Sequence, residues 1–201
     1  MYDEGSWEKI WKSERELNFF GKKLRKEQFK SIKKILKNMD LSKHSRIIDI
    51  GCGEGLTLSF FKKYGFENII GIDVSKSSID LCRKRGYNIG KDIFLMDGSN
   101  TKFKNKEFDL VFSDGLLEHF KDFEPFIKEW CRISRKYVLI TQPNHFSFWS
   151  RLVRVLSEPE VYEYTYTIKD FENVFNKYGF RLIKKLNYNW KEQWTLLFLR
   201  K

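Results

Sequence analysis

The chain has 201 residues, of which 41% are hydrophobic and 17% aromatic, and its formal net charge is +11. This length and apolar content favour one folded domain with its own core and argue against wholesale disorder. The positive charge is compatible with nucleic acid or an anionic membrane surface as a partner. However, the chain contains no alanine and many lysines, so we discount the charge as a compositional bias.

The ends, apolar runs and cysteines point to an ordinary protein of the cytoplasm. No run of about 18 apolar residues predicts a membrane span, and the first residues lack the pattern of a signal peptide. The three cysteines, Cys52, Cys82 and Cys131, include no closely spaced pair. We therefore expect reduced thiols rather than a disulfide framework or a zinc site.

Two helices are expected before the first strand. Residues with helical spacing predict one over 7–17, and a clearer apolar stripe from Leu24 to Met39 predicts the second. Residues 1–46 carry 13 Lys and Arg against 7 Asp and Glu, so the excess charge leans towards these helices.

From Arg46 onward, short apolar strands alternate with helices. The expected strands are 47–50, 68–73, 92–97, 108–113, 137–141, 180–188 and 194–199, and the expected helices are 56–64, 75–85, one from Glu124, and 167–178. This alternation predicts a parallel sheet with helices on both faces. The last two strands are too close in sequence for a crossover helix, so they should pair antiparallel.

A glycine-rich turn follows the first strand, with the sequence Asp49-Ile50-Gly51-Cys52-Gly53-Glu54-Gly55. Glycines allow a tight bend and a close approach of a ligand to the main chain. The spacing is GxGxG, which differs from the GxGxxG of a dinucleotide site. Because Asp49 and Glu54 would repel a pyrophosphate, the turn favours a ligand that carries a positive charge.

Acidic residues also stand at the ends of the next two strands. Asp73 lies 22 residues after Gly51, the position at which a carboxylate binds the two hydroxyls of a ribose. Asp97, followed by Gly98, ends the third strand and could accept from an adenine amino group. In an open parallel sheet these positions meet at the carboxyl edge, where ligands bind.

These blocks resemble the class I S-adenosylmethionine-dependent methyltransferases. The resemblance rests on the stretch 47–55, on Gly71-Ile72-Asp73-Val74-Ser75, on 108–113 and on Leu117-Glu118-His119-Phe120, and it extends over about residues 40–200. It implies a Rossmann-like, doubly wound α/β fold with a seven-stranded sheet, mostly parallel with an antiparallel last strand. Amino-directed nucleic-acid methylases carry an Asn/Asp-Pro-Pro-aromatic motif where this chain has 113–116. The resemblance is therefore to the small-molecule, lipid and quinone branch.

The resemblance also implies a cofactor, S-adenosylmethionine, and a role for each matching position. The glycine turn would pack against the methionine part, Asp73 would bind the ribose, Asp97 would contact the adenine, and Ser113 would lie beside the methionine part and the acceptor. The implied cofactor-binding residues are Asp49, Gly51, Cys52, Gly53, Asp73, Val74, Asp97, Gly98 and Ser113.

Two histidines are candidates for a catalytic base. His119 follows the fourth strand and His145 the fifth, and histidine titrates near neutral pH. A packed or surface role is the alternative for each of them. The three histidines are scattered without a pattern of metal ligands, so we expect no metal.

The expected organisation is one domain over 1–201. Residues 1–45 form the N-terminal helices, 46–143 the cofactor-binding core, 144–166 a substrate lid, and 167–201 the closing helix and strands. The aromatic stretch 146–166 has no steady period, which favours the lid over a core role.

The expected function is in-line methyl transfer to a small-molecule or lipid-precursor acceptor. Three alternatives remain open. The first is an RNA or protein methyltransferase that uses the basic N-terminal helices, in which RNA is not the favoured acceptor. The others are a non-catalytic cofactor-binding module and, with the weakest support, an NAD-dependent oxidoreductase. The sequence leaves the oligomeric state open.

Overall fold

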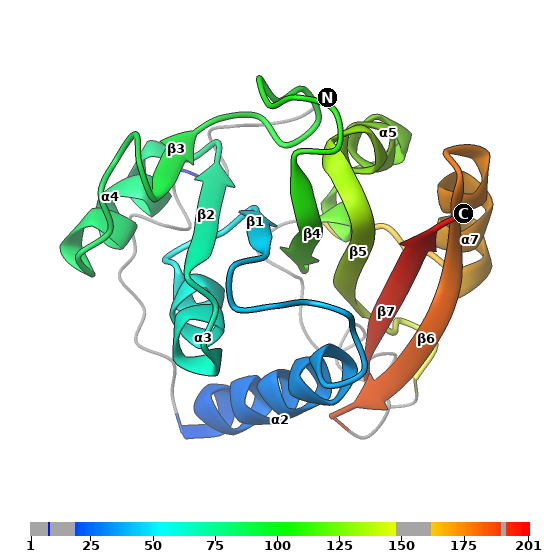
Figure 1. Ribbon diagram of the computed structural model, residues 1–201. Helices are drawn as coiled ribbons and strands as arrows, with labels where there is room; N and C mark the ends of the chain where they lie inside the picture. The colour runs from blue at the N-terminus through cyan, green and yellow to red at the C-terminus, as the bar shows by residue number, and fades with distance from the viewer. Residues whose placement is uncertain (1–7, 9–18, 148–161, 190–191) are drawn as a thin grey trace.

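The computed structural model describes residue 8 and residues 19–147, 162–189 and 192–201. Within these ranges, helices flank a seven-stranded sheet (Figure 1). In chain order the elements are α2 (Phe19–Leu36), β1 (Arg46–Ile50), α3 (Leu56–Tyr64), β2 (Asn68–Asp73), α4 (Lys76–Lys84), β3 (Ile93–Leu95), β4 (Phe108–Asp114), the 3-10 helix η1 (Leu117–His119), α5 (Glu124–Ile133), β5 (Ser134–Pro143), α7 (Ile168–Lys177), β6 (Phe180–Tyr188) and β7 (Gln193–Arg200). The helix expected over 7–17, apart from residue 8, and most of the expected lid lie outside the described residues.

The strands are arranged in the order β3-β2-β1-β4-β5-β7-β6. Neighbours from β3 to β5 pair in parallel, whereas β7 is antiparallel to both β5 and β6. The chain winds outward from β1 to β3 and then returns to β4 on the other side of β1. The predicted doubly wound sheet with an antiparallel last strand is thus confirmed.

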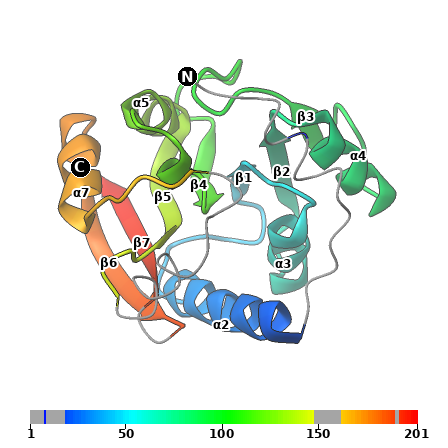
Figure 2. The same cartoon turned by 180° about the vertical axis from the view of Figure 1, so that it is seen from behind.

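Helices cover both faces of the sheet, as expected. One core cluster joins Ile48 and Ile50 of β1 to residues of α5 and α7, and the other joins Ile47 to residues of α2, α3 and α4. Successive β1 side chains point to opposite faces, which is why both clusters draw on the same short strand. The view from behind shows α5 near α7 on one side of the molecule, and α2 near α3 (Figure 2).

Three helix ends predicted from the sequence have the expected capping contacts in the structure. Gly65 ends α3 with φ of +112°, a left-handed conformation that suits glycine. Ser75 caps α4 by accepting from the Ser78 N–H. Thr167 and Asp170 form the predicted capping box at the start of α7.

Two strands differ in length from the expectation. β3 spans only Ile93–Leu95, because it is an edge strand and its one partner, β2, ends opposite Leu95. β5 is longer than 137–141 because it has partners on both sides, and its last residue, Pro143, still pairs with Gln193 of β7.

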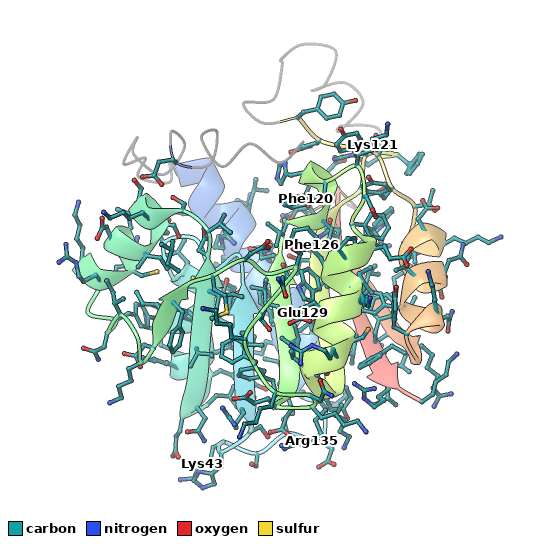
Figure 3. All side chains as sticks on the ribbon, turned by 90° about the horizontal axis from the view of Figure 1, so that it is seen from above. Lys43, Phe120, Lys121, Phe126, Glu129 and Arg135 are labelled. Atoms are coloured by element: carbon teal, nitrogen blue, oxygen red, sulfur yellow. The ribbon has the colours of Figure 1, made fainter. Side chains whose placement is uncertain are left out.

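The parallel register brings the strand ends to one edge of the sheet. Ile50 lies opposite both Ile72 and Ser113, and Asp114 lies opposite Thr141. Seen from above, Phe120 and Lys121 lie at this edge (Figure 3). The loops that follow β1, β2, β3, β4 and β5 therefore converge there.

Candidate active site

The glycine turn between β1 and α3 is held in a conformation that other residues rarely adopt. Gly51, Gly53 and Gly55 have φ of +72°, +52° and +79°. The N–H groups of Gly51 and Cys52 both donate to the Ile72 carbonyl, at 2.9 and 3.0 Å, which binds the turn to β2. A Cβ on Gly51 would lie 3.3 Å from the Leu116 side chain, so the glycine keeps the space beside the turn open.

Asp73 joins the glycine turn to the end of β2. Its carboxylate accepts from the N–H groups of Gly53 and Ser75, each at 2.9 Å, and only 8% of the residue is exposed. Burial raises the pKa of Asp73, and the bonds from these N–H groups oppose that shift. The side chain is thereby fixed at the wall of a cleft.

Asp49 is a buried carboxyl without a hydrogen-bond partner among the described residues. The residue is 1% exposed, and burial raises its pKa well above the ordinary value, with Asp114 and Asp73 adding to the shift. A buried, unpaired carboxyl is costly unless a partner arrives. Its place just before the glycine turn fits the ammonium group of a bound amino acid.

One pocket lies at the carboxyl ends of β1, β2 and β4. Asp73 and Val74 line one side, Asp97 and Gly98 another, and the aromatic pair Phe120 and Phe126 closes it. The Phe120 and Phe126 ring centroids are 4.2 Å apart, and both side chains lie by the first turns of α5 (Figure 3).

Gly98 can only be glycine in this arrangement. A Cβ there would lie 2.4 Å from Cγ2 of Ile50, a distance that real contacts do not reach. The Gly98 carbonyl also accepts from the Trp130 indole N–H at 3.0 Å, which fixes the peptide in place. The pocket wall is therefore main chain and leaves room for a flat ring.

A second pocket adjoins the first. Gly51, Asp114 and Gly115 line both, and the second is otherwise bounded by the glycine turn, the start of α3, residues of α2, and the loop before β7. The side chains from α2, that loop and the first residue of β7 are Leu24, Arg25, Gln28, Asn189 and Gln193. The two pockets together form one cleft along the carboxyl edge of the sheet.

The fit of S-adenosylmethionine can be judged from these residues. The orphaned carboxyl of Asp49, the carboxylate of Asp73 and the main-chain wall at Gly98 are suited to an ammonium group, a ribose and a flat base, respectively. The chain thus offers suitable groups for each part of the cofactor.

The predicted cofactor residues divide into those that line the cleft and those that do not. Gly51, Asp73, Val74, Asp97 and Gly98 line the first pocket, and Cys52 and Gly53 line the second. Asp49 lines neither of them, and neither does Ser113. It is fully buried, and its hydroxyl donates to the Ile50 carbonyl at 2.9 Å, so it joins β4 to β1.

Asp114 and its partners were missed by the sequence reasoning. Its carboxylate accepts from Arg25, Gln28 and Thr141, which links α2 to β4 and β5. Gln28 also donates to the Thr141 hydroxyl at 3.2 Å. A polar glutamine in the apolar stripe of the second helix was the one available signal for this contact.

The two candidate histidines have different surroundings. His119 in η1 hydrogen-bonds through Nδ1 with the Tyr162 carbonyl at 3.2 Å, and burial lowers its pKa. His145, 7% exposed, lies with Nε2 at 3.0 Å from the Glu163 carboxylate. The third histidine, His44, is exposed and pairs with Glu67 near the start of β1.

The remaining observations concern the cysteines, possible membrane spans and possible metal ligands. Cys52, Cys82 and Cys131 are free and buried. In the described ranges, no helix is long and apolar enough to cross a membrane, and no three His, Cys, Asp or Glu side chains come together as metal ligands would.

Known methyltransferases are similar to this chain in sequence. A family model described as a methyltransferase domain matches residues 48–140. The chain is 29% identical over 102 residues to the ubiquinone biosynthesis O-methyltransferase of Pelagibacter ubique, and 34% identical over 105 residues to the pavine N-methyltransferase of Thalictrum flavum. These stretches cover 47% and 49% of this chain but only 39% and 29% of the two relatives.

Among solved structures, the magnesium protoporphyrin IX methyltransferase of Synechocystis with bound SAH superposes with a TM-score of 0.72. It shares 15% sequence identity, and the match covers 98% of this chain and 94% of that chain. Residues 48–140 are thus similar to a methyltransferase domain, and the sheet order is that of the Rossmann-like fold of the class I S-adenosylmethionine-dependent methyltransferases.

Proposed function

We propose that this chain transfers the methyl group of S-adenosylmethionine to a small-molecule or lipid-precursor acceptor. The observation that carries the proposal is the enclosure of the region where the two pockets meet. The Asp114 side chain there is 19% exposed, and Glu118, whose Oε1 lies beside Gly115, is 5% exposed. Side chains in this region can surround a small acceptor group. The broad surface of a polymer would not enter it as easily.

The cofactor supplies a methyl group that is already activated by a sulfonium charge. The chain then has to hold the reactants in line and exclude water. Alignment alone can contribute about 7–11 kcal/mol to a reaction of this type. In this proposal Asp73 holds the ribose, Gly98 and the Phe120–Phe126 pair enclose the base, and Asp49 meets the ammonium group.

Several similar proteins are named for small-molecule or lipid acceptors, which supports the proposal. They include the ubiquinone and pavine methyltransferases and a fatty-acid O-methyltransferase of Mycolicibacterium smegmatis, which is 26% identical over 91 residues. Their acceptors differ, so they support a class of acceptor rather than one molecule.

The test is to incubate the purified chain with methyl-labelled S-adenosylmethionine and a fractionated cell extract. We expect label in the small-molecule or lipid fraction. An Asp73→Asn variant should transfer less label when the cofactor is below saturation, and Asp80→Asn, a change of the same kind on α4, is the control that should transfer as the wild type does. Label found only in RNA or protein would contradict the proposal. Binding of S-adenosylhomocysteine without any transfer would favour the non-catalytic alternative.

One observation favours RNA as a second candidate acceptor. Between 21 and 36 of α2, every exposed residue is a lysine: Lys22, Lys23, Lys26, Lys30, Lys33 and Lys34. This face begins next to the second pocket, which residues of α2 line. Phosphate contacts by lysines make binding fall steeply with salt. RNA binding that is strongly salt-dependent and lost when these lysines are changed to glutamine would support this candidate.

A further inference from the structure

The exposed side of α2 carries lysines along most of the helix. We define the lysine face as the six exposed lysines Lys22, Lys23, Lys26, Lys30, Lys33 and Lys34. We propose that the lysine face docks the protein on the surface of an anionic lipid bilayer and so holds the second pocket near the lipid headgroups. This inference rests on the proposed methyl transfer and adds the place where a lipid-precursor acceptor is met.

The lysines lie in one sector of the helix. At 3.6 residues per turn, successive residues are rotated by about 100°, so the six positions fall within about a third of the circumference. The row from Lys22 to Lys34 is about 18 Å long at a rise of about 1.5 Å per residue. Helix α2 runs along an outer side of the molecule (Figures 1 and 2). The row can therefore present several charges at once to a flat surface.

The opposite side of α2 holds the helix on the sheet. Ile32, Ile35 and Leu36 are at most 4% exposed and belong to the core cluster on this face of the sheet. The Ser31 hydroxyl also bonds with the hydroxyl of Thr195 of β7 at 2.7 Å. Because the apolar stripe is already buried in the protein, it is not free to insert among acyl chains. Docking through the lysine face is therefore electrostatic.

The charge of the chain is concentrated on this helix. The 18 residues of α2 include seven lysines and arginines and one glutamate, and the whole chain has a net charge of +11. Helices α5 and α7, which cover the other face of the sheet, each contain two basic and two acidic residues. A compositional bias raises the number of lysines everywhere, but it does not remove acidic residues from one helix. The structure thus gives the charge a place that composition alone did not.

The carboxylates of the described residues near α2 are engaged by other lysines or leave most of the face uncovered. Glu27, the single acid of α2, pairs with Lys30 at 2.6 Å. Asp40, which follows α2, and Glu67, which precedes β2, pair with lysines outside the lysine face. The lysine face thus keeps most of its charge.

Two neighbouring elements extend the positive surface. The Phe29 and Phe60 rings stack at a centroid distance of 4.4 Å, which places the end of α3, with the exposed Lys63, beside α2. On β6, the exposed Lys184 lies opposite Leu197, a member of the core cluster on the α2 side. Residues that lie opposite each other on paired strands point to the same face. The basic surface is therefore wider than the helix alone.

The chemistry of the lysine face suits lipid phosphates better than RNA. Lysine is a compact charge without a fixed bonding geometry, and mobile anionic headgroups can gather around it. Proteins that bind single-stranded RNA commonly offer aromatic rings or arginines on which bases stack. Here the Phe29 ring stacks on Phe60, and Arg25, the arginine of α2, bonds with Asp114 at the cleft. The lysine face offers charge alone.

The lysine face begins beside the second pocket. Leu24 and Arg25 line that pocket, and Lys23 and Lys26 flank them in the chain. The pocket is therefore separated from a docked surface by about the diameter of one helix, about 10–12 Å. A lipid precursor held in the bilayer by its apolar chain has a short path to the pocket.

The first experiment measures binding of the purified chain to vesicles by cosedimentation. The vesicles contain phosphatidylcholine alone, or phosphatidylcholine and phosphatidylglycerol in equal amounts. We expect binding to the mixed vesicles at low ionic strength, and loss of binding near about 1 M salt, where the screening length falls to about 3 Å. No binding to the mixed vesicles, equal binding to both kinds, or binding that salt does not weaken would overturn the proposal.

Two variants with the same change in net charge test whether the lysine face or the total charge is responsible. The face variant combines four substitutions on α2, and the control variant combines four at exposed lysines elsewhere: Lys22→Gln, Lys26→Gln, Lys30→Gln and Lys34→Gln, against Lys91→Gln, Lys102→Gln, Lys128→Gln and Lys169→Gln. Glutamine has nearly the helix propensity of lysine, and circular dichroism checks the fold of both variants.

The two variants should differ clearly in binding. Each lysine near an anionic surface contributes about fivefold, so the face variant should bind the mixed vesicles at least about 100-fold more weakly than the wild type. The control variant should bind nearly as the wild type does. Equal losses in the two variants would show that total charge is responsible and would overturn the proposal.

The same binding measurement is made with RNA. A single-stranded RNA and an RNA duplex are offered at the salt and phosphate concentrations used for the mixed vesicles. Weaker binding of both RNAs than of the vesicles supports lipid docking. Tighter binding of either RNA would overturn it and favour the RNA candidate.

A last measurement separates docking from methyl transfer. Label transfer from S-adenosylmethionine to the active extract fraction is followed with that fraction in mixed vesicles and in detergent. We expect the face variant to be slower than the wild type on vesicles and equal to it in detergent, with unchanged affinity for S-adenosylhomocysteine. Equal rates on vesicles would overturn the role of docking. Vesicle binding without transfer to any fraction would contradict the proposed function and leave the docking surface in place.

Discussion

The cleft has two ends that are built in different ways: the end at the glycine turn and Gly98, proposed to bind the cofactor (the cofactor end), and the end at Asp114, proposed to bind the acceptor (the acceptor end). At the cofactor end, the main chain does most of the shaping: three glycines with positive φ, N–H groups fixed on Ile72 and Asp73, and the bare peptide of Gly98. At the acceptor end, side chains from α2, β4, β5, η1 and the 162–166 segment meet, with few glycines involved. The main-chain conformation at the first end depends on residues close together in the sequence. The side chains at the second end come from elements that are far apart in the sequence. Substitutions at the two ends should therefore affect stability and binding differently.

The largest effect is expected from Gly98→Ala. The added Cβ would clash with Ile50, a fully buried residue, so the peptide would have to move away from the pocket. We expect a loss of about 1–3 kcal/mol in the free energy of unfolding, together with a clear loss of affinity for S-adenosylhomocysteine. Urea denaturation and calorimetry measure the two. The exposed neighbour change Asn100→Ala is the control, and an unaltered stability would mean that the main-chain wall is not rigid.

Asp73→Asn should mainly weaken cofactor binding. The change removes the charge that is expected to hold the ribose but keeps one acceptor for the N–H groups of Gly53 and Ser75. A hydrogen bond to a charged group contributes about 1.5–3 kcal/mol, so affinity should fall by about tenfold or more. Calorimetry with S-adenosylhomocysteine measures this, and equal affinities of Asp73→Asn and the exposed Asp80→Asn would argue against ribose binding at β2.

Asp49→Asn should stabilise the protein while it weakens cofactor binding. Because the folded pKa of Asp49 is raised, the unfolded chain loses this proton first, so ionisation penalises folding as pH rises above the ordinary carboxyl range. The amide removes that penalty, and we expect a gain of about 1 kcal/mol at neutral pH. The gain should disappear at acid pH, where both states of the wild type are protonated.

Urea denaturation near about pH 4 and about pH 8 brackets the range in which a buried carboxyl titrates. A variant that is less stable than the wild type at the higher pH would show that Asp49 is paired within the folded chain. Unchanged affinity for S-adenosylmethionine would separate Asp49 from the ammonium group.

Ser113→Ala should have the smallest effect on stability and on cofactor affinity. It tests whether the residue at the junction of β4 and β1 belongs to the cofactor end. The hydroxyl bonds to the Ile50 carbonyl, so its loss should cost about 1 kcal/mol of stability. Affinity for S-adenosylhomocysteine should change by less than about twofold. A tenfold loss of affinity without a loss of stability would support the predicted place of Ser113 in the cofactor site.

The features that could be predicted from the sequence are mainly those that depend on residues close together in the chain. The sheet with its reversed last strand, the stops at glycine, the cap at Ser75 and the capping box at Thr167 all depend on neighbouring residues, and each is confirmed. The lengths of β3 and β5 were wrong because strand length depends on the partner strands, which a single sequence does not contain.

The sequence by itself determined the glycine turn and the acidic strand ends, because glycines with positive φ and strand ends at fixed spacing favour one arrangement of the main chain. Only the tertiary structure decided the acceptor end. Arg25 reaches Asp114 across 89 positions, and His145 meets Glu163 through a segment fixed on η1. Such contacts depend on how elements that are distant in sequence pack on the sheet, so no local sequence pattern predicts them.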